Sequence, residues 1–177
     1  MPLTTQTFAS PVPEALRWVA GRSFPADRPL INVSQAAPVA PPPAGLRAAM
    51  ARALDDPATH LYSADLGWDP LRDGLARHWT TAYGAPTHPE QIAITSGCNQ
   101  AFAATIAALC DPGDAVILPT PWYFNHKMWL DMTGITAVPL PTGDSLLPDP
   151  DMARRLITPK TRAIAVVSPN NPAGIEY

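Results

Sequence analysis

The stretch Gln91–Asp114, QIAITSGCNQAFAATIAALCDPGD, contains in turn the signals of a strand, a tight turn, a helix and a helix stop. Ile92–Ile94 is a short apolar run of the kind buried in parallel sheets, and Ser96-Gly97 marks a turn after it. Apolar residues then recur at helical spacing, and the sequence DPGD ends the pattern. The apolar stripe of this helix consists of Phe102, Ile106 and Leu109.

The start of this expected helix is suited to an anion. The first backbone N–H groups of a helix have no partner within it, and the helix dipole adds positive potential there. An anion placed over Gly97, Cys98 and Asn99 would therefore be stabilised, as phosphates often are at such positions. The alternative is an ordinary strand–helix turn in which glycine only allows tightness.

Composition indicates a globular protein with no affinity for polyanions. The 177 residues are 46% hydrophobic and carry a formal net charge of -3. We expect no nucleic-acid partner, because no basic patch is present. We also expect no membrane segment, because Pro, Asp or Lys interrupts every apolar stretch before a spanning length. A cytoplasmic location is the resulting expectation.

The cysteines and histidines point to neither a disulfide nor a metal. Cys98 and Cys110 lie about three turns apart on one helical segment, so they are not expected to pair. Cys98 is either a nucleophile activated by the helix N-terminus or a small buried residue, and we favour the buried residue. The four histidines have no metal-ligand spacing, so no metal site is expected.

The first 84 residues give weaker signals. Prolines interrupt residues 1–43, which leaves a brief helix around Leu16–Ala20 and a short strand at Leu30–Val33. Helices are expected at Leu46–Leu54 and from Asp69, with Asp69 as N-cap, Pro70 in the first helical position and Gly84 as the stop. Tyr62 falls in the loop between them, where a tyrosine more often packs than binds a ligand.

Strands and helices alternate from Gln91 to Val167. Apolar strands are expected at 115–118, 135–140 and 163–167, with helices at 124–132 and after the N-cap Asp149. This alternation predicts an α/β fold, a mostly parallel sheet with helices on both faces in three layers.

Three aromatic residues follow the strand at 115–118. Ligands of open α/β sheets bind at the carboxyl ends of strands, so a ring of Trp122, Tyr123 or Phe124 could stack on a planar ligand. The alternative is that these rings belong to the core of the next helix. We assign two of the three rings to the core.

With these residues in view, the chain resembles the class I/II aminotransferases, fold-type I enzymes that use pyridoxal 5′-phosphate (PLP). The resemblance extends from about Leu30 to the end, and the motifs stand in the family's order. They are Y-x4-G-x3-L-R at Tyr62–Arg72, T-S-G-x-x-Q-A at Thr95–Ala101, D-P-G-D with the following P-W-Y at Asp111–Tyr123, and S-P-N-N-P-x-G at Ser168–Gly174.

The resemblance implies roles for single residues. It places the PLP phosphate over Gly97, Cys98 and Asn99. It gives the ring that stacks on the pyridine to Tyr123, with Trp122 as the alternative, and the hydrogen bond to the phenolic oxygen to Asn171. Tyr62 would reach the phosphate of a neighbouring subunit, which implies a homodimer. The resemblance also implies an N-terminal arm or small-domain segment at 1–44 and the first part of the PLP-binding large domain at 45–177.

Two departures from the family pattern stand out. The family's arm carries a glycine whose N–H meets the substrate carboxylate, and this sequence offers Ala36 or Ala37 instead. The family's Schiff-base lysine follows its N-P-x-G motif, whereas the two lysines here, Lys127 and Lys160, lie before it and outside any family-like context. We therefore expect a truncated chain without its catalytic residues, whose complete form would be catalytic.

The implied activity is transfer of an amino group between an amino acid and a 2-oxo acid. A lyase, decarboxylase or cyclising synthase of the same fold remains open, because the fold hosts all of these reactions. A non-catalytic fragment is the third possibility. A generic nucleotide-binding domain is disfavoured, because no G-x-G-x-x-G or Walker loop follows any expected strand.

Overall fold

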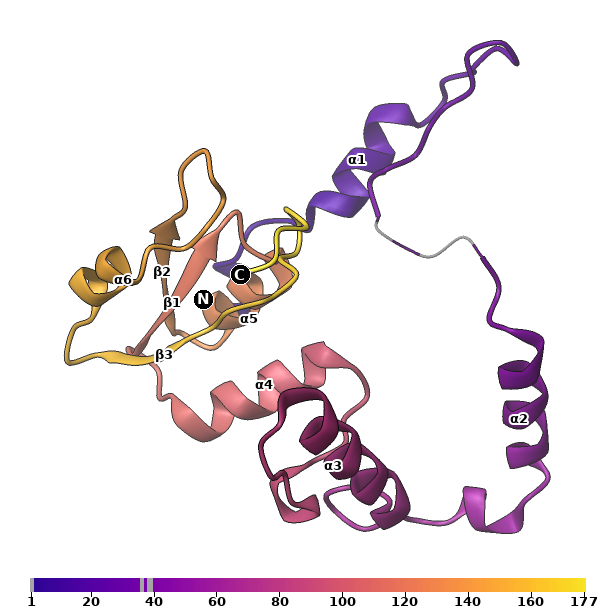
Figure 1. Ribbon diagram of the computed structural model, residues 1–177. Helices are drawn as coiled ribbons and strands as arrows, with labels where there is room; N and C mark the ends of the chain where they lie inside the picture. Colours follow the sequence, from indigo (N-terminus) through magenta and orange to yellow (C-terminus); the bar gives the residue numbers. More distant parts are fainter. Residues whose placement is uncertain (1, 36, 38–39) are drawn as a thin grey trace. The chain divides into compact units, whose positions relative to one another are not determined.

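The computed structural model describes residues 2–35, 37 and 40–177 (Figure 1). The chain divides into two compact units. One consists of the residues up to Trp18 together with Ser96–Tyr177, and the other of Val19–Thr95. Among the described residues, no helix combines the length and the apolar character needed to cross a membrane.

The first unit is built on a parallel three-stranded sheet. The strands are β1 (Ala115–Thr120), β2 (Thr136–Pro141) and β3 (Thr161–Ile164), in the order β2-β1-β3. β1 lies in the centre, and its first five residues are buried, as expected of an apolar strand with neighbours on both sides. Its Ile117 pairs with Val138 of β2 and with Ile164 of β3.

Helices cover both faces of this sheet. The face that carries Val116 and Leu118 packs against α4 (Cys98–Leu109) and α5 (Phe124–Met132), through Ile106 and Leu130. The opposite face carries Ile117 and Leu140, which pack against Ala153 of α6 (Pro150–Leu156). Side chains of a strand alternate between the faces, so one apolar strand serves both cores. The three-layer α/β fold expected from the sequence is confirmed.

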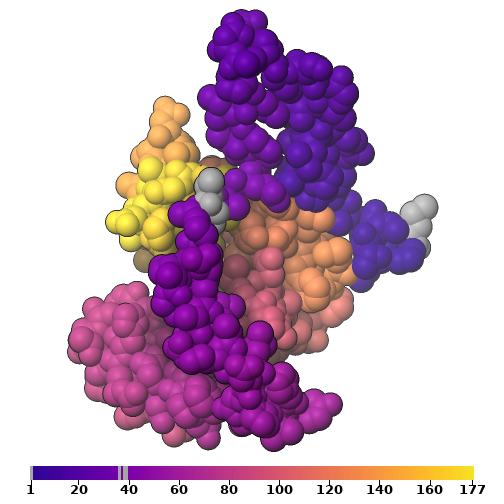
Figure 2. Space-filling model, turned by 90° about the vertical axis from the view of Figure 1, so that its right-hand side faces the viewer, coloured from indigo at the N-terminus to yellow at the C-terminus, as the bar shows by residue number. Residues whose placement is uncertain are grey.

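The N-terminal residues of this unit pack against α5. A short 3₁₀ helix, Leu3–Thr5, contacts α5, and the first residues lie against it in the space-filling view (Figure 2). The helix α1 (Pro11–Val19) is longer than the brief helix around Leu16–Ala20 that the sequence predicted. The prediction was wrong because Pro11 and Pro13 lie in its first turn, where the missing N–H groups would have no helical partner.

The second unit contains α2 (Ala44–Leu54) and α3 (Asp69–Tyr83), together with two short 3₁₀ helices, Pro57–His60 and Pro89–Gln91. Both α-helices were expected. Gly84 ends α3 with a left-handed φ of 68°, as predicted. Trp68 rather than Asp69 holds the N-cap position, so this boundary differs by one residue.

Two predicted strands are absent from the described chain. Leu30–Val33 is irregular, and its Ile31 and Val33 are exposed. Ile92–Ile94 is also irregular: the Ile94 N–H donates to Leu66 O at 2.9 Å, and a Cβ on Gly67 would come within 2.6 Å of the Ile94 side chain. Both segments have the apolar composition of a strand, but neither pairs with a strand of the sheet, and composition alone does not make a strand.

Candidate functional site

The carboxyl edge of the sheet gathers three of the predicted segments. Because β1 and β3 are parallel and adjacent, residues 121–123 and 168–174 leave the sheet at the same edge. Five residues separate the end of α4 from the start of β1, and α4 packs on the sheet face. The C-terminus of α4 therefore lies toward the amino edge of the sheet, and its N-terminus points toward the carboxyl edge. The rings of Phe102 in the second turn of α4 and His126 in the first turn of α5 stack with centroids 3.9 Å apart, so the two helices are in contact near their N-termini.

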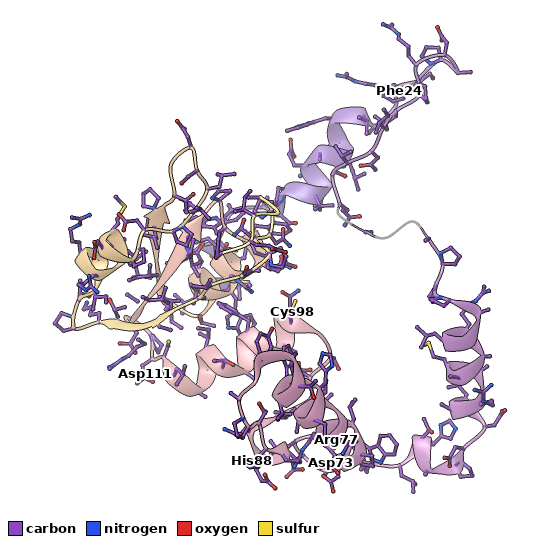
Figure 3. The ribbon with its side chains drawn as sticks, viewed as in Figure 1. Phe24, Asp73, Arg77, His88, Cys98 and Asp111 are labelled. Carbon is purple, nitrogen blue, oxygen red and sulfur yellow. The ribbon has the colours of Figure 1, made fainter. Side chains whose placement is uncertain are left out.

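The N-terminus of α4 is open to solvent. Gly97 is its N-cap, with φ 87° and ψ 171°, a backbone conformation that is essentially restricted to glycine. The first turn contains no acidic residue, and Cys98 and Asn99 are exposed. Figure 3 shows Cys98 at this end of the helix and Asp111 beyond the other end. Positive potential and exposed N–H groups are therefore presented to any anion at this position.

The exposure of Cys98 corrects one expectation from the sequence. Cys98 is exposed and Cys110 is half-buried, and both are free thiols. The sequence pattern favours a buried Cys98, but the first residues of α4 are exposed and project beyond the helix–sheet core. Burial raises the pKa of the Cys110 thiol, and the nearby Asp114 carboxylate raises it further.

Trp122 and Tyr123 differ in their packing. Trp122 packs against the core cluster, and the Lys127 Nζ lies 5.9 Å from its ring centroid, a cation–π contact. Tyr123 is the N-cap residue of α5 and is half-buried at the edge. Its hydroxyl oxygen accepts a hydrogen bond from Asn125 Nδ2 at 2.6 Å. The Tyr123 ring is thus held in place at the start of α5, beside the His126 ring that stacks on Phe102 of α4.

His126 is part of this site, although no sequence motif assigns it a role. Its ring stacks on Phe102 and meets Tyr123 edge-on, with centroids 5.1 Å apart. Burial lowers the pKa of His126 from its ordinary value of 6.5, so the neutral ring is favoured at pH 7. No sequence signal pointed to it, because its partner Phe102 lies on a different helix.

The loop after β3 distinguishes two neighbouring asparagines. Asn170 is buried, its side-chain oxygen accepts from the Ala173 N–H at 2.9 Å, and its backbone bonds to Gly174 and Ile175. Asn171 is exposed. Asn170 therefore stabilises the loop, while Asn171 is available for a ligand.

The remaining candidate residues lie in the second unit or outside the described residues. Tyr62 is fully exposed, so the packing role that was the alternative reading finds no support. Ala37 is exposed, and its N–H donates to Gln35 O at 3.0 Å. Ala36 lies outside the described residues.

Neither lysine is placed for chemistry at this edge. Lys127 forms an ion pair through Nζ with both carboxylate oxygens of Asp131, one turn along α5. Lys160 is exposed, precedes β3, and its carbonyl accepts from the Ala115 N–H at the start of β1. It therefore lies at the opposite, amino edge of the sheet. In the part of the chain that the structure describes, no group of three or more His, Cys, Asp or Glu could hold a metal.

The model of the family described as aminotransferase class I and II matches residues 28–177. This chain belongs to that family. The aspartate/prephenate aminotransferase of Thermus thermophilus is 35% identical over 137 residues, which are 76% of this chain and 35% of that protein. An aromatic aminotransferase of Arabidopsis thaliana is 36% identical over 124 residues, 67% of this chain and 31% of that protein.

Solved structures agree with these sequence matches. A single mutant of the Thermus thermophilus aspartate aminotransferase superposes with a TM-score of 0.85 at 28% identity, covering 100% of this chain and 46% of that one. Fold type I is therefore established for this aminotransferase-family chain. The chain spans about a third of the length of the two relatives named above.

Proposed function

We propose that residues 1–177 bind the phosphate and the ring of PLP in an aminotransferase that moves an amino group between an amino acid and a 2-oxo acid. The observation that carries the proposal is that Tyr123 and the loop of Asn171 follow two adjacent parallel strands at one edge of the sheet, where α4 packs against α5 through the Phe102–His126 stack. Aminotransferases use PLP, which when bound supplies an electron sink for the amino acid's α-carbon.

The α4 N-terminus fits the phosphate. Gly97 has no Cβ, and an added one would meet no atom within 4 Å, so the space directly beside Gly97 is open. The backbone N–H groups of Cys98 and Asn99 lie in the first turn, with no acidic residue in that turn to repel an anion. A hydrogen bond to a charged group contributes about 1.5 to 3 kcal/mol, which is enough for these groups to determine the affinity.

Tyr123 and Asn171 fit the ring. Tyr123 is fixed by Asn125 and flanked by His126, so it offers a planar face whose position is already set. Trp122, the alternative stacking residue, is less suited because it packs against the core. The Asn171 amide donates to the phenolic oxygen in this proposal, and the bond stabilises the anionic form of that oxygen.

No lysine among residues 1–177 is placed to react with the aldehyde of PLP. Lys127 is neutralised by Asp131, and Lys160 lies at the other edge of the sheet. We therefore assign to this chain the binding and orientation of the cofactor and no covalent step. The family match favours an aminotransferase over a lyase, decarboxylase or cyclising synthase of the same fold.

We further infer a homodimer, in which the exposed Tyr62 contacts the phosphate in the partner subunit, as the family resemblance implies. Contact of Ala37, or of Ala36, with the substrate carboxylate is proposed on the same basis. The division at residue 44 into arm and large domain, and the cytoplasmic location, stay predictions from the sequence.

Calorimetric titration with pyridoxine 5′-phosphate and with pyridoxine tests the proposal. Both ligands lack the aldehyde, and they differ only in the phosphate. We expect residues 1–177 to bind the phosphorylated ligand at least tenfold more tightly, because one charged hydrogen bond of about 1.5 kcal/mol corresponds to that factor. Equal affinities, or no binding of either ligand, would contradict the proposed site.

A further inference from the structure

The start of α4 is capped by a residue of its own first turn. The N-cap residue, Gly97, has no side chain that could cap the helix. Gln100, the third residue of α4, folds back instead, and its Oε1 accepts a hydrogen bond from the Ser96 N–H at 2.5 Å. A Glu or Gln at this helix position commonly reaches back to a backbone N–H in this way. The bond joins the first turn of α4 to the turn that precedes it.

Gln100 is the neutral alternative at a position where a charge would stabilise the helix. A glutamate has the same reach, and a charged acceptor forms a stronger hydrogen bond than a neutral one. Its negative charge would also interact favourably with the helix dipole. Gln100 has neither advantage, and the first turn of α4 contains no acidic residue. The helix is therefore capped without a negative charge.

The absence of this charge matters for the proposed phosphate. Residue 100 lies in the same turn as Cys98 and Asn99, so a carboxylate there would stand within about 5.4 Å along the helix axis of the N–H groups proposed to bind the anion. This distance is shorter than the screening length in physiological salt, about 8 Å. A phosphate monoester carries nearly two negative charges at pH 7, so it would be repelled, whereas an uncharged ligand would not.

The bond to Ser96 also orients the backbone of the site. The ψ angle of Gly97, 171°, sets the plane of the following peptide and hence the direction of the Cys98 N–H. Gly97 holds this angle together with a φ of 87°, a combination that persists only where the surroundings enforce it. Gln100 supplies such a restraint, because it ties the residue before Gly97 to the helix after it.

We propose that Gln100 sets the preference of this site for a phosphorylated ligand, by holding the Ser96-Gly97 turn with a cap that carries no charge. Gln100 is a positioning residue, which acts through the N–H groups of Cys98 and Asn99. This role rests on the proposed function, because it concerns the same phosphate position. It adds one requirement that a purely structural cap does not have, which is that the cap must be neutral.

Calorimetric titration of residues 1–177 with pyridoxine 5′-phosphate and with pyridoxine tests this role. Gln100→Glu keeps the acceptor and adds a charge. We expect it to lower the affinity for pyridoxine 5′-phosphate about tenfold and to leave the affinity for pyridoxine unchanged. Raising salt from about 0.1 M to about 1 M shortens the screening length from about 10 Å to about 3 Å, so most of this loss should disappear.

Gln100→Ala separates the restraint from the charge. It removes the acceptor and adds no charge, so its loss of affinity relative to the unaltered chain should be the same at both salt concentrations. Hydrogen exchange gives a readout without ligand: the Ser96 amide should exchange several times faster in Gln100→Ala and at an unchanged rate in Gln100→Glu. Far-UV circular dichroism checks that each variant keeps the fold, because Gln100 is exposed.

Gln91→Glu is the matched control. Gln91 ends the 3₁₀ helix Pro89–Gln91 of the second unit, and its Oε1 accepts from the His88 N–H at 2.8 Å. The substitution makes the same change of charge at the same kind of cap, in a segment that the proposed site does not include. We expect it to change neither affinity.

Three results would overturn this role of Gln100. The first is an unchanged affinity of Gln100→Glu for pyridoxine 5′-phosphate, and the second is an equal loss in Gln91→Glu, which would assign the effect to net charge. The third is a loss in Gln100→Glu that does not respond to salt, which would make Gln100 a structural cap only. If the unaltered chain does not prefer the phosphorylated ligand, the proposed function fails as well. If it does and Gln100→Glu keeps that preference, only the role of Gln100 fails.

Discussion

Replacing Gly97 by alanine tests both the fold of the site and its proposed function. Gly97 has φ 87° and ψ 171°, and an added Cβ would meet nothing within 4 Å. The substitution therefore introduces no steric clash with other residues. What it introduces is backbone strain alone, because residues with a side chain rarely adopt this conformation.

The structure allows two responses to that strain. If the backbone keeps its conformation, the free energy of unfolding should fall by about 1 to 3 kcal/mol. If it relaxes, the N–H groups of the first turn of α4 turn away from the position proposed for the phosphate. Loss of one hydrogen bond to a charged group costs about 1.5 to 3 kcal/mol, so affinity for pyridoxine 5′-phosphate should fall roughly 10- to 150-fold.

Urea unfolding and calorimetric titration measure the two effects on the same sample. Gly143→Ala is the matched control, because Gly143 also has a positive φ, 61°, and open space around it, and it lies in the loop between β2 and α6. This control should lose stability and keep its affinity for the ligand. The reasoning is refuted if Gly97→Ala changes neither quantity, or if both variants weaken binding equally.

Three further predictions concern other residues of the same unit. Asn170→Ala should lower the free energy of unfolding by about 1 to 3 kcal/mol, because it removes the buried acceptor of a backbone N–H. Asn171→Ala should change the free energy of unfolding by less than about 0.5 kcal/mol and should weaken pyridoxine 5′-phosphate binding in titration. The reverse pattern would exchange their roles. Burial lowers the pKa of His126 in the folded chain, so near and below pH 6.5 the unfolded chain binds more protons than the folded chain. The free energy of unfolding measured in urea should therefore fall as pH drops through 6.5, and His126→Phe should remove this part of the pH dependence. Borohydride treatment in the presence of PLP should give no single adduct by mass spectrometry, and a stoichiometric adduct on Lys127 or Lys160 would contradict the placement of both lysines.

The sequence predicted the starts of α4, α5 and α6 correctly, because a helix start depends on a capping residue and on apolar spacing within the next few residues. α5 begins at Phe124 as its apolar spacing predicted, and α6 begins at Pro150 with the Asp149 carboxylate accepting from the Asp151 N–H at 2.8 Å. The N-terminus of α4 was likewise predicted from the glycine and the periodicity that follows it. Each of these features depends on residues within one or two turns, so the sequence contains the required information.

Strands and the site's inner contacts depend on distant residues. Ile92–Ile94 has the composition of a buried strand, but a strand also needs a partner, and its nearest backbone partner is Leu66. β3 was expected at 163–167 and is assigned at Thr161–Ile164, because its pairing with β1 determines the bounds. The stacking of His126 on Phe102 joins two helices, and no periodicity of either helix reveals it.

The geometry of a parallel sheet separates cofactor binding from covalent chemistry in this chain. Lys160 precedes β3 and Ser168 lies beyond its other end, and the four residues of β3 alone span about 13 Å, at roughly 3.3 Å each. A lysine side chain reaches only a fraction of that length, and the other lysine is held by Asp131. The aldehyde of PLP should therefore contribute nothing to binding by residues 1–177. PLP and pyridoxine 5′-phosphate should bind with the same affinity, because the interactions that remain are those of the phosphate with α4, of the ring with Tyr123 and of the phenolic oxygen with Asn171.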